Sequence, residues 1–200
     1  MIIIKVRSKE DMIKAIKKAI DVLESGGLVV IPTETVYGLA SKMEYAEKIY
    51  EVKKRPKTKP LPVQSTLAEV EELGHFNETA RELAKLYWPG PLTMVVKAKP
   101  RVPETVTAGT GKVGIRVPKH EFAYRLLEEI GPLAVTSANL SGHKAPKSPE
   151  EVDVQADLLI DMGPVAGTPS TVIEVEANKV RLIREGAIPF KKIIIDIIEH

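Results

Sequence analysis

Several short segments place hydroxyl and charged side chains directly after apolar runs, and these are the residues whose types could do chemistry. The first follows the apolar residues 28–31: residues 32–39 read PTETVYGL and offer the hydroxyls of Thr33 and Thr35, a carboxylate and a phenol. Loops at strand ends are where α/β proteins bind ligands. The two threonines could instead shape a turn before a helix, because short hydroxyl side chains also hydrogen-bond the nearby backbone.

A second segment, residues 53–60, reads KKRPKTKP and carries five cationic side chains with no acid among them. Pro56 and Pro60 restrict the backbone, so we expect the cations on a defined loop rather than on a solvated helix face. Lysine as a point charge and arginine as a bidentate donor together suit a polyphosphate. A charge run that only solvates the surface is the alternative interpretation.

Residues 113–118, VGIRVP, place Arg116 within an apolar strand pattern. Burying a guanidinium without a partner is costly, so Arg116 is expected to meet an anionic group. That group is either a ligand carboxylate or phosphate, or a protein carboxylate in a core ion pair, and the sequence leaves both open.

The segment at residues 135–142, VTSANLSG, follows another apolar run and combines small residues with hydrogen-bonding groups. Small side chains let a ligand approach the backbone closely, and Asn139 is one of only three asparagines in the chain. The alternative for Asn139 is an N-cap before a turn. Residues 168–172 (TPSTV) and 181–186 (RLIREG) add hydroxyls and two arginines near further strand ends.

Residue types that are absent narrow the chemistry. The chain has no cysteine, which excludes disulfides, a thiol nucleophile, iron–sulfur clusters and thiolate zinc sites. Its four histidines form no Ser/His/Asp arrangement, and no histidine metal motif or Gly-rich phosphate loop is present. Cations and hydroxyls remain, and they suit phosphoryl or nucleotidyl transfer, which depends on positioning and charge neutralisation. Any Mg²⁺ would be held mainly by ligand phosphates and water, with no metal site made by the protein.

Apolar periodicity supplies the elements that must position these segments. A helix capped by Ser8 is expected to end at Gly26, and further helices are expected at residues 46–53, 67–73, 77–87 and 121–130. Strands are expected at residues 2–6, 28–31, 61–64, 93–98, 114–117, 133–136, 158–161, 171–175 and 180–183. The tail, residues 191–200, could be a strand or a short helix.

The interleaving of helices and strands predicts an α/β fold with a mixed, twisted sheet, and the lack of a regular βαβ rhythm argues against a simple doubly wound fold. With 200 residues, 44% of them hydrophobic, the chain can bury a core. A formal charge of +2 does not require a broad nucleic-acid-binding surface. No apolar run approaches the roughly 20 residues of a membrane span, and no signal-peptide pattern is present, so we expect a cytoplasmic protein.

Seven motifs together resemble the YrdC-like threonylcarbamoyl-AMP synthase family: PTETVYGL, KKRPKTKPL, WPGPLT, VGIRVP, VTSANLSG, PSTV and RLIREG. They follow the family's order within residues 10–188, and the resemblance implies the single-domain form over residues 1–200. It implies a twisted open sheet with a concave, positively charged cavity. The implied reaction joins L-threonine, bicarbonate and ATP into L-threonylcarbamoyl-AMP and pyrophosphate. The adenylate would then pass to a tRNA threonylcarbamoyl transferase complex that modifies the adenosine next to the anticodon.

The resemblance also assigns the site residues, by motif. L-Threonine would be bound by Thr33, Thr35, Gln64, Arg116, Ser137 and Ser170. ATP would be bound by Lys53, Arg55, Lys59, Lys112, Asn139, Ser141, Ser148 and Arg184. Lys53 and Arg55 would be catalytic: with Mg²⁺ bound through the ATP phosphates, they would neutralise the pyrophosphate that leaves when a carbamate oxygen attacks the α-phosphate.

Two positions depart from the family pattern. Gln64 stands where many members have a histidine, and it can hydrogen-bond but cannot titrate, which puts an acid–base role there in doubt. Lys112 stands where a hydroxyl residue usually precedes VGxR, and it is expected to add a cation near phosphate. The chain stops near residue 200, so the additional C-terminal domain of longer members is expected to be absent.

Two rival functions stay open. A module that binds double-stranded RNA or tRNA without turnover would also use a concave basic surface, although 4% aromatic residues give few platforms for base stacking. A carbamoyl-adenylate-forming domain would use the same fold on carbamoyl phosphate, but such domains sit in long chains with segments that have no counterpart here.

Overall fold

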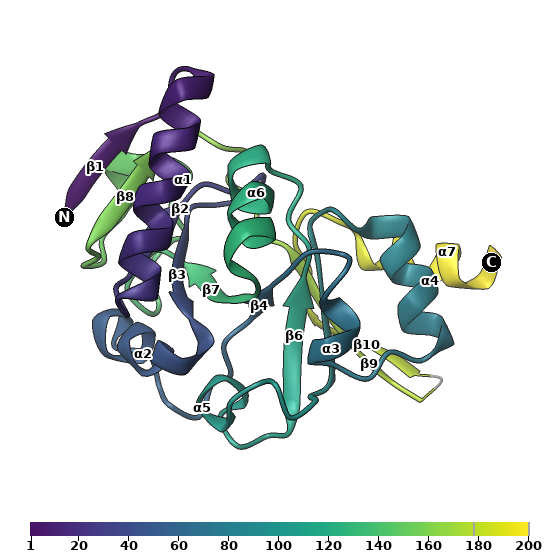
Figure 1. Ribbon diagram of the computed structural model, residues 1–200. Coiled ribbons are helices and arrows are strands. Elements are labelled where there is room, and N and C mark those ends of the chain that lie inside the picture. Colours follow the sequence, from purple (N-terminus) through teal and green to yellow (C-terminus); the bar gives the residue numbers. More distant parts are fainter. Residues whose placement is uncertain (178, 200) are drawn as a thin grey trace.

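Strands from the whole chain form one twisted sheet in the computed structural model, which describes residues 1–177 and 179–199 (Figure 1). Their order across the sheet is β1-β8-β2-β3-β7-β4-β6-β5-β9-β10. β8 is parallel to β1 and β2, and the β4–β6 and β5–β9 pairs are also parallel, whereas the remaining neighbours are antiparallel. The predicted mixed α/β fold is therefore confirmed. The strands are β1 (Ile2–Lys5), β2 (Val29–Ile31), β3 (Gly38–Lys42), β4 (Val63–Gln64), β5 (Leu92–Lys97), β6 (Lys112–Arg116), β7 (Leu133–Ser137), β8 (Leu158–Asp161), β9 (Thr171–Glu176) and β10 (Lys179–Arg184).

Helices cover the sheet and divide the apolar residues between two cores. α1 and α6 pack beside each other and bury their apolar faces in one core with alternate residues of β2, including Val29 and Ile31 (Figure 1). Val30, between them, points to the second core with α2, because successive strand residues face opposite sides of a sheet. The helices are α1 (Lys9–Glu24), α2 (Glu47–Lys53), α3 (Val70–Leu73), α4 (Glu78–Tyr87), α5 (Glu104–Thr107), α6 (Glu121–Ile130) and α7 (Phe190–Glu199), with short 3-10 turns at Met43–Tyr45 and Pro149–Glu151.

Most of the expected elements are present near their expected positions. Ser8 caps α1 by accepting a hydrogen bond from the Asp11 amide at 3.1 Å, as its spacing predicts. α6 and β8 have the predicted bounds, and the tail is a helix, α7. α3 is shorter than the predicted 67–73, and α5 was not predicted.

The largest difference is β3, a strand that the sequence did not predict between the expected strand at residues 28–31 and the expected helix at residues 46–53. β3 pairs antiparallel with both β2 and β7. Its first residue, Gly38, lies against Val135 of β7 so closely that an added Cβ would come within 2.7 Å of the valine methyl group. Close approach of the strands requires small side chains, and β3, with the sequence GLASK, therefore lacks the alternation of apolar and polar residues that would predict a strand.

The topology makes neighbours of the chemically interesting segments. β2 ends at residue 31 and β3 begins at residue 38, so residues 32–37 form the loop between them. β7 ends beside the start of β3, where Ser137 is in register with Gly38, whereas the carboxyl ends of β4 and β6 adjoin each other beside the start of β7. The start of β9 and the end of β10 join them through β5. Segments far apart in the sequence are thus neighbours.

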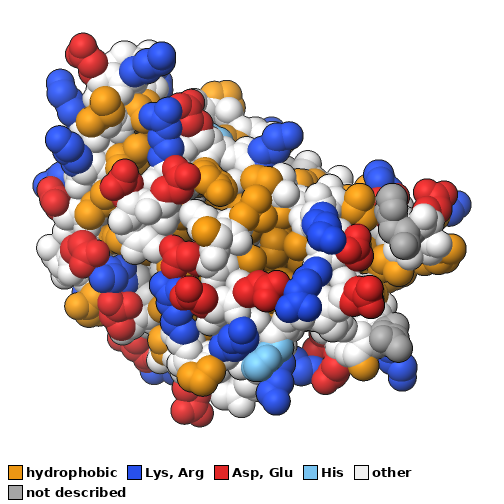
Figure 2. All heavy atoms as spheres, turned by 45° about the vertical axis from the view of Figure 1, so that its right-hand side comes forward, with side chains coloured by type: hydrophobic (Ala, Val, Ile, Leu, Met, Phe, Trp, Pro, Cys, Tyr) orange, Lys and Arg blue, Asp and Glu red, His pale blue; other side chains and the backbone are white. Residues whose placement is uncertain are grey.

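The surface drawn in Figure 2 mixes charges of both signs with apolar side chains. Lys and Arg alternate with Asp and Glu there and do not gather into a basic stripe. Among the described residues, no helix has both the length and the apolar character that crossing a bilayer requires.

Tyr37 ties the loop after β8 to the sheet, and its removal tests this link. The buried phenol donates a hydrogen bond to the carbonyl of Gly163 at 2.6 Å and accepts one from the amide of Met162 at 3.2 Å. We expect Tyr37→Phe to lower the free energy of unfolding by about 1–3 kcal/mol, because both backbone groups lose a partner. Urea unfolding measures this change against Tyr45→Phe, which alters an exposed ring. An equal effect of the two substitutions would contradict the assigned role.

Candidate functional site

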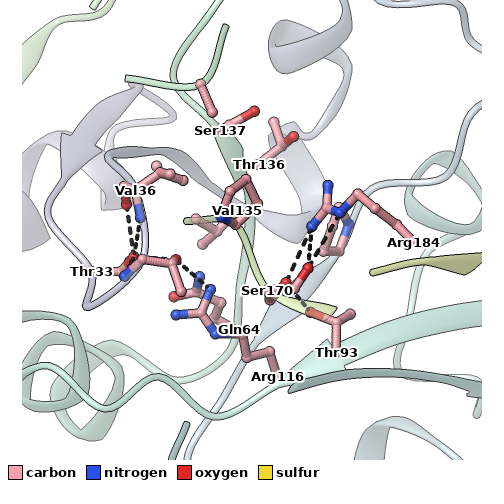
Figure 3. A pocket seen from close by; sticks show the side chains of 15 residues that line it. Thr33, Val36, Gln64, Thr93, Arg116, Val135, Thr136, Ser137, Ser170 and Arg184 are labelled. Atoms are coloured by element: carbon pink, nitrogen blue, oxygen red, sulfur yellow. Dashed lines mark hydrogen bonds between the residues drawn. The ribbon is translucent and has the colours of Figure 1, made fainter. Parts of the chain in front are cut away.

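A pocket of about 100 Å³ opens where these strand ends and loops converge (Figure 3). Seven of the residues assigned to substrates from the sequence line it together: Thr33, Thr35, Gln64, Arg116, Ser137, Ser170 and Arg184. The other lining residues are Val36, Gly38, Pro62, Thr93, Val135, Thr136, Ala145 and Pro169. Hydroxyls and two guanidinium groups thus face a cavity that also has an apolar wall.

The two threonines of the PTETVYGL loop form a hydrogen-bonded pair with a defined direction. Thr33 Oγ1 donates to the carbonyl of Val36 at 2.7 Å, and a carbonyl can only accept. Thr33 Oγ1 lies 2.9 Å from Thr35 Oγ1, so Thr35 must be the donor in that contact. Thr35 Oγ1 in turn accepts from Arg116 Nη1 at 3.1 Å. The loop therefore holds the arginine, rather than merely forming a turn.

Arg116 is 6% exposed and is held from three directions. Besides Thr35, its Nε donates to the carbonyl of Gly90 at 3.3 Å. Its Nη2 lies 2.7 Å from Oε1 of Glu34, an ion pair between two side chains of low exposure. The angles of this contact do not make a hydrogen bond, and both atoms are otherwise without a hydrogen-bond partner among the described residues. The structure therefore supplies the protein carboxylate that the sequence left as one of two options.

A second guanidinium faces the first across the pocket. Arg184 donates through Nη2 to the Ser170 carbonyl at 2.7 Å, and Ser170 Oγ lies 2.9 Å from Thr93 Oγ1 (Figure 3). Burial and then the charge of Arg116 lower the pKa of Arg184 from its usual value. Two arginines with one buried carboxylate, Glu34, leave an excess of positive charge, which suits an anionic group of a ligand.

Lys53 corrects the expectation that all five cations of residues 53–60 are displayed on a loop. It is the last residue of α2 and only 2% exposed. Its ammonium group donates to the carbonyl of Ser137 at 2.5 Å and to the carbonyl of Asn139. Burial, and secondarily the charge of Arg55, lowers the pKa of Lys53 to about 8. Lys53 therefore fixes the backbone that follows β7, because two carbonyl acceptors surround its charge.

The rest of that basic segment lies outside the pocket lining. Arg55 donates through Nη2 to the Pro60 carbonyl at 2.7 Å, so it closes its own loop, and burial lowers its pKa. Lys59 is exposed, and Lys57 pairs with Glu47. The structure thus shows a defined loop, as the prolines indicate, with fewer free cations than the sequence suggests.

The loop after β7 carries three of the residues assigned to ATP. Asn139 is buried and donates to the carbonyls of Leu140 and His143, both at 2.9 Å. Its Oδ1 and the hydroxyl of Ser141 are buried without a hydrogen-bond partner in the described part of the chain. Ser148 begins the 3-10 turn at Pro149–Glu151, and it is not among the pocket-lining residues.

Lys112 is also absent from the pocket lining. It begins β6, whereas Arg116 ends it, so about 13 Å of strand separates them at about 3.3 Å per residue. Its ammonium contacts Glu174 at 2.6 Å and Glu176 at 3.3 Å. These hydrogen bonds raise the pKa of Lys112. Because two carboxylates hold the Lys112 ammonium away from the pocket lining, we do not expect Lys112 to supply the predicted cation near phosphate.

Replacing Lys112 tests this correction. We expect Lys112→Ala to change the catalytic efficiency of the chain less than about twofold, because surface substitutions away from a site have small effects. Glu174 keeps its ion pair with Arg181 at 2.5 Å in this variant. The measurement is steady-state kinetics of the activity proposed below, and a tenfold loss would return Lys112 to the site.

Sequence reasoning missed two residues that shape the site. Glu34 was noted only as a carboxylate within its loop, although the need of Arg116 for an anionic partner was a signal that could have singled it out. Thr93 was read only as the start of a strand, and its contact with Ser170 depends on the β5–β9 pairing, which no local pattern shows. Within residues 1–177 and 179–199, no three His, Asp or Glu side chains gather in a way that could hold a metal ion.

The chain is similar in sequence to proteins of one family. The Sua5/YciO/YrdC family model, described as telomere recombination, matches residues 21–186. A putative threonylcarbamoyl-AMP synthase of Methanocaldococcus jannaschii is 34% identical over 190 residues, which cover 88% of this chain and 90% of that protein. The threonylcarbamoyl-AMP synthase of Bacillus subtilis is 39% identical over 190 residues, which cover 89% of this chain but 55% of the relative. The chain therefore spans little more than half of this longer relative.

Solved structures show the same arrangement. Sua5 of P. abyssi complexed with L-threonine has a TM-score of 0.91 and 36% identity, covering 98% of this chain and 61% of that one. YciO of E. coli has a TM-score of 0.84 and 27% identity, covering 95% of this chain and 97% of that one. With its family model matching most of its length and its relatives aligned over nearly all of it, the chain belongs to the Sua5/YciO/YrdC family.

Proposed function

We propose that this chain is a threonylcarbamoyl-AMP synthase, which forms L-threonylcarbamoyl-AMP and pyrophosphate from L-threonine, bicarbonate and ATP. The observation that carries the proposal is the pocket where Arg116, the paired threonines and Ser170 converge. A family relative of 36% identity has been crystallised with L-threonine. Arg116 binds the threonine carboxylate, and Val36, Pro62 and Val135 form an apolar wall against which the methyl group packs.

The reaction needs three groups to meet, and the chain's role is to position them. After its ammonium group has given up a proton to water, the threonine amine attacks CO₂ with release of a second proton, or bicarbonate with release of water. One oxygen of the resulting carbamate then attacks the α-phosphate of ATP. The P–O bond to pyrophosphate breaks as the new P–O bond forms. Holding these reactants together converts an encounter of several molecules into a step within one complex.

ATP is expected over the loop after β7, next to the threonine pocket. The unpartnered Asn139 Oδ1 and Ser141 hydroxyl are polar groups that a nucleotide can satisfy. Lys53 holds this loop in place through the Ser137 and Asn139 carbonyls, and Arg55, Lys59 and Ser148 lie on the flanking segments. Mg²⁺ accompanies ATP as part of the substrate and neutralises phosphate charge, since phosphates and water are its usual ligands in such sites.

The product is a mixed anhydride, so it has to be passed on quickly to an acceptor. A tRNA threonylcarbamoyl transferase complex in the cytoplasm is the consumer we propose. Direct tRNA binding by the chain alone is the rival function, and the mixed charges on the face in Figure 2 give it little support.

Pyrophosphate release from ATP tests the proposal. We expect release only when L-threonine and bicarbonate are both present, with threonylcarbamoyl-AMP detected by mass spectrometry. Omitting either substrate is the control, and carbamoyl phosphate in their place should give no pyrophosphate. Release that ignores threonine, or salt-dependent tRNA binding without turnover, would contradict the proposed function.

A further inference from the structure

The carboxylate of Glu34 is a charged group beside the pocket that the proposed reaction does not use. Glu34 stands between the lining residues Thr33 and Thr35, yet it is not itself part of the pocket lining. Both of its carboxylate oxygens are buried and accept no hydrogen bond from the described residues. A buried carboxylate without hydrogen-bond donors is costly, so an arrangement of this kind requires an explanation.

The neighbouring Arg116 also has an atom that lacks a hydrogen-bond partner. Its Nη1 and Nε have hydrogen-bond acceptors, but Nη2 has none, although it lies 2.7 Å from Oε1 of Glu34. The two unsatisfied atoms therefore carry opposite charges and adjoin each other. An α-amino acid zwitterion presents an ammonium and a carboxylate two bonds apart on one carbon, which is the complementary pair of charges.

No other group near the pocket competes for this role. The lining residues in the described part of the chain include no carboxylate, imidazole or ammonium group. His120, which interacts electrostatically with Glu34, has a pKa lowered chiefly by burial, so it is mainly neutral at pH 7 and does not offset the charge of Glu34. Of the basic groups that the structure describes, only the Arg116 guanidinium is in ion-pair contact with Glu34.

We propose that Glu34 binds the α-ammonium group of the amino-acid substrate, which enters between Glu34 and Arg116 and replaces their single contact with two. This inference rests on the proposed function and adds a specificity to it: the site recognises a free amino acid by both of its charges. The side chain of Glu34 is 20% exposed, so it can turn toward the pocket when the contact with Arg116 opens. N-acylated and deaminated compounds would lack the group that Glu34 recognises.

Binding of two ligands to two variants tests the proposal without relying on turnover. Titration calorimetry compares L-threonine with 2,3-dihydroxybutanoate of the same configuration, in which a hydroxyl replaces the α-ammonium group. Both ligands are titrated into the unaltered chain and into Glu34→Gln. We expect the unaltered chain to prefer L-threonine by about 10- to 100-fold, the range for one charge-assisted hydrogen bond. In Glu34→Gln this preference should fall below about threefold, with binding of the analogue nearly unchanged.

The matched control is Glu121→Gln, which neutralises an exposed carboxylate on α6 that pairs with Arg125, and it should preserve the preference. Equal weakening of both ligands in Glu34→Gln would overturn the inference, because Glu34 would then act only by holding Arg116. Retention of the full preference in Glu34→Gln would overturn it too, while leaving the proposed function intact. Failure of the unaltered chain to bind L-threonine at all would instead remove the proposed function, and the inference with it.

Discussion

Arg116→Ala should reduce threonine-dependent pyrophosphate formation by about 100-fold or more, equivalent to roughly 2.7 kcal/mol in transition-state stabilisation. The buried guanidinium donates a hydrogen bond to the Thr35 hydroxyl and also lines the pocket. Its loss removes the group proposed to bind the threonine carboxylate. Steady-state kinetics should show the loss mainly as a rise in the KM for threonine, whereas the KM for ATP changes little.

Arg116→Ala should also destabilise the fold, because it leaves Glu34 as a buried charge without a partner. Breaking one side of a buried ion pair costs about 3–5 kcal/mol, and the 20% exposure of the Glu34 side chain places the expected value near the lower end. Urea unfolding measures it, with Arg125→Ala as the control, since Arg125 forms an exposed pair with Glu121. Arg116→Lys should not restore activity, because a lysine cannot donate in three fixed directions. Full activity in Arg116→Lys would contradict this account of the site.

Lys53→Met should lower the rate of pyrophosphate formation by about 100-fold, although methionine keeps much of the apolar stem. The carbonyls of Ser137 and Asn139 lose the ammonium group as their hydrogen-bond donor, so the loop that follows β7 is no longer held in place by Lys53. Lys54→Met is the matched control, because Lys54 is adjacent and exposed. Equal activities of the two variants would show that holding the loop through Lys53 is dispensable.

Lys53 also predicts a pH dependence of stability with a definite sign. Its pKa is about 8 in the folded chain and near 10.5 when exposed. Between these values the unfolded chain binds more protons than the folded one, so the free energy of unfolding rises with pH. Relative to Lys53→Met, the unaltered chain should gain about 1–3 kcal/mol between pH 7 and pH 10, at 1.36 kcal/mol per pKa unit. Chemical unfolding across this pH range measures it, and a falling difference would contradict the lowered pKa.

Local patterns predicted the parts of this molecule that local physics determines. The cap at Ser8, the helix at residues 121–130 and the strand at residues 158–161 follow from periodicity and capping, which depend on neighbours in the sequence. β3 could not be predicted from its own segment, because Gly38 is required by close packing against Val135. Val135 lies almost a hundred positions away in the chain. The residues next to such a glycine in the sequence do not indicate that it packs closely against another strand.

The site was predictable in composition but not in its internal contacts. The need of Arg116 for an anion could be stated from its apolar surroundings, whereas the identity of Glu34 required the β2–β3 loop to fold back beside β6. In the sequence Lys53 is indistinguishable from the other cations of residues 53–60, because the carbonyls that surround its ammonium group belong to the segment that follows β7. Motif proximity does not tell which end of a strand reaches the pocket, so it could not show that Lys112, which begins β6, lies outside the pocket lining.

The strand order has a consequence for how the protein is made. The pocket draws on residues from Thr33 to Arg184, and its sheet edge is completed by β9 and β10, which are synthesised last among its strands. A chain leaving the ribosome can form α1 and the β2–β3 hairpin early, yet it cannot assemble the pocket until Ser170 and Arg184 have emerged. Non-local pairing of this kind is slow to form. The nascent chain therefore passes most of its synthesis without a binding site, and ligand can stabilise it only near the end of translation.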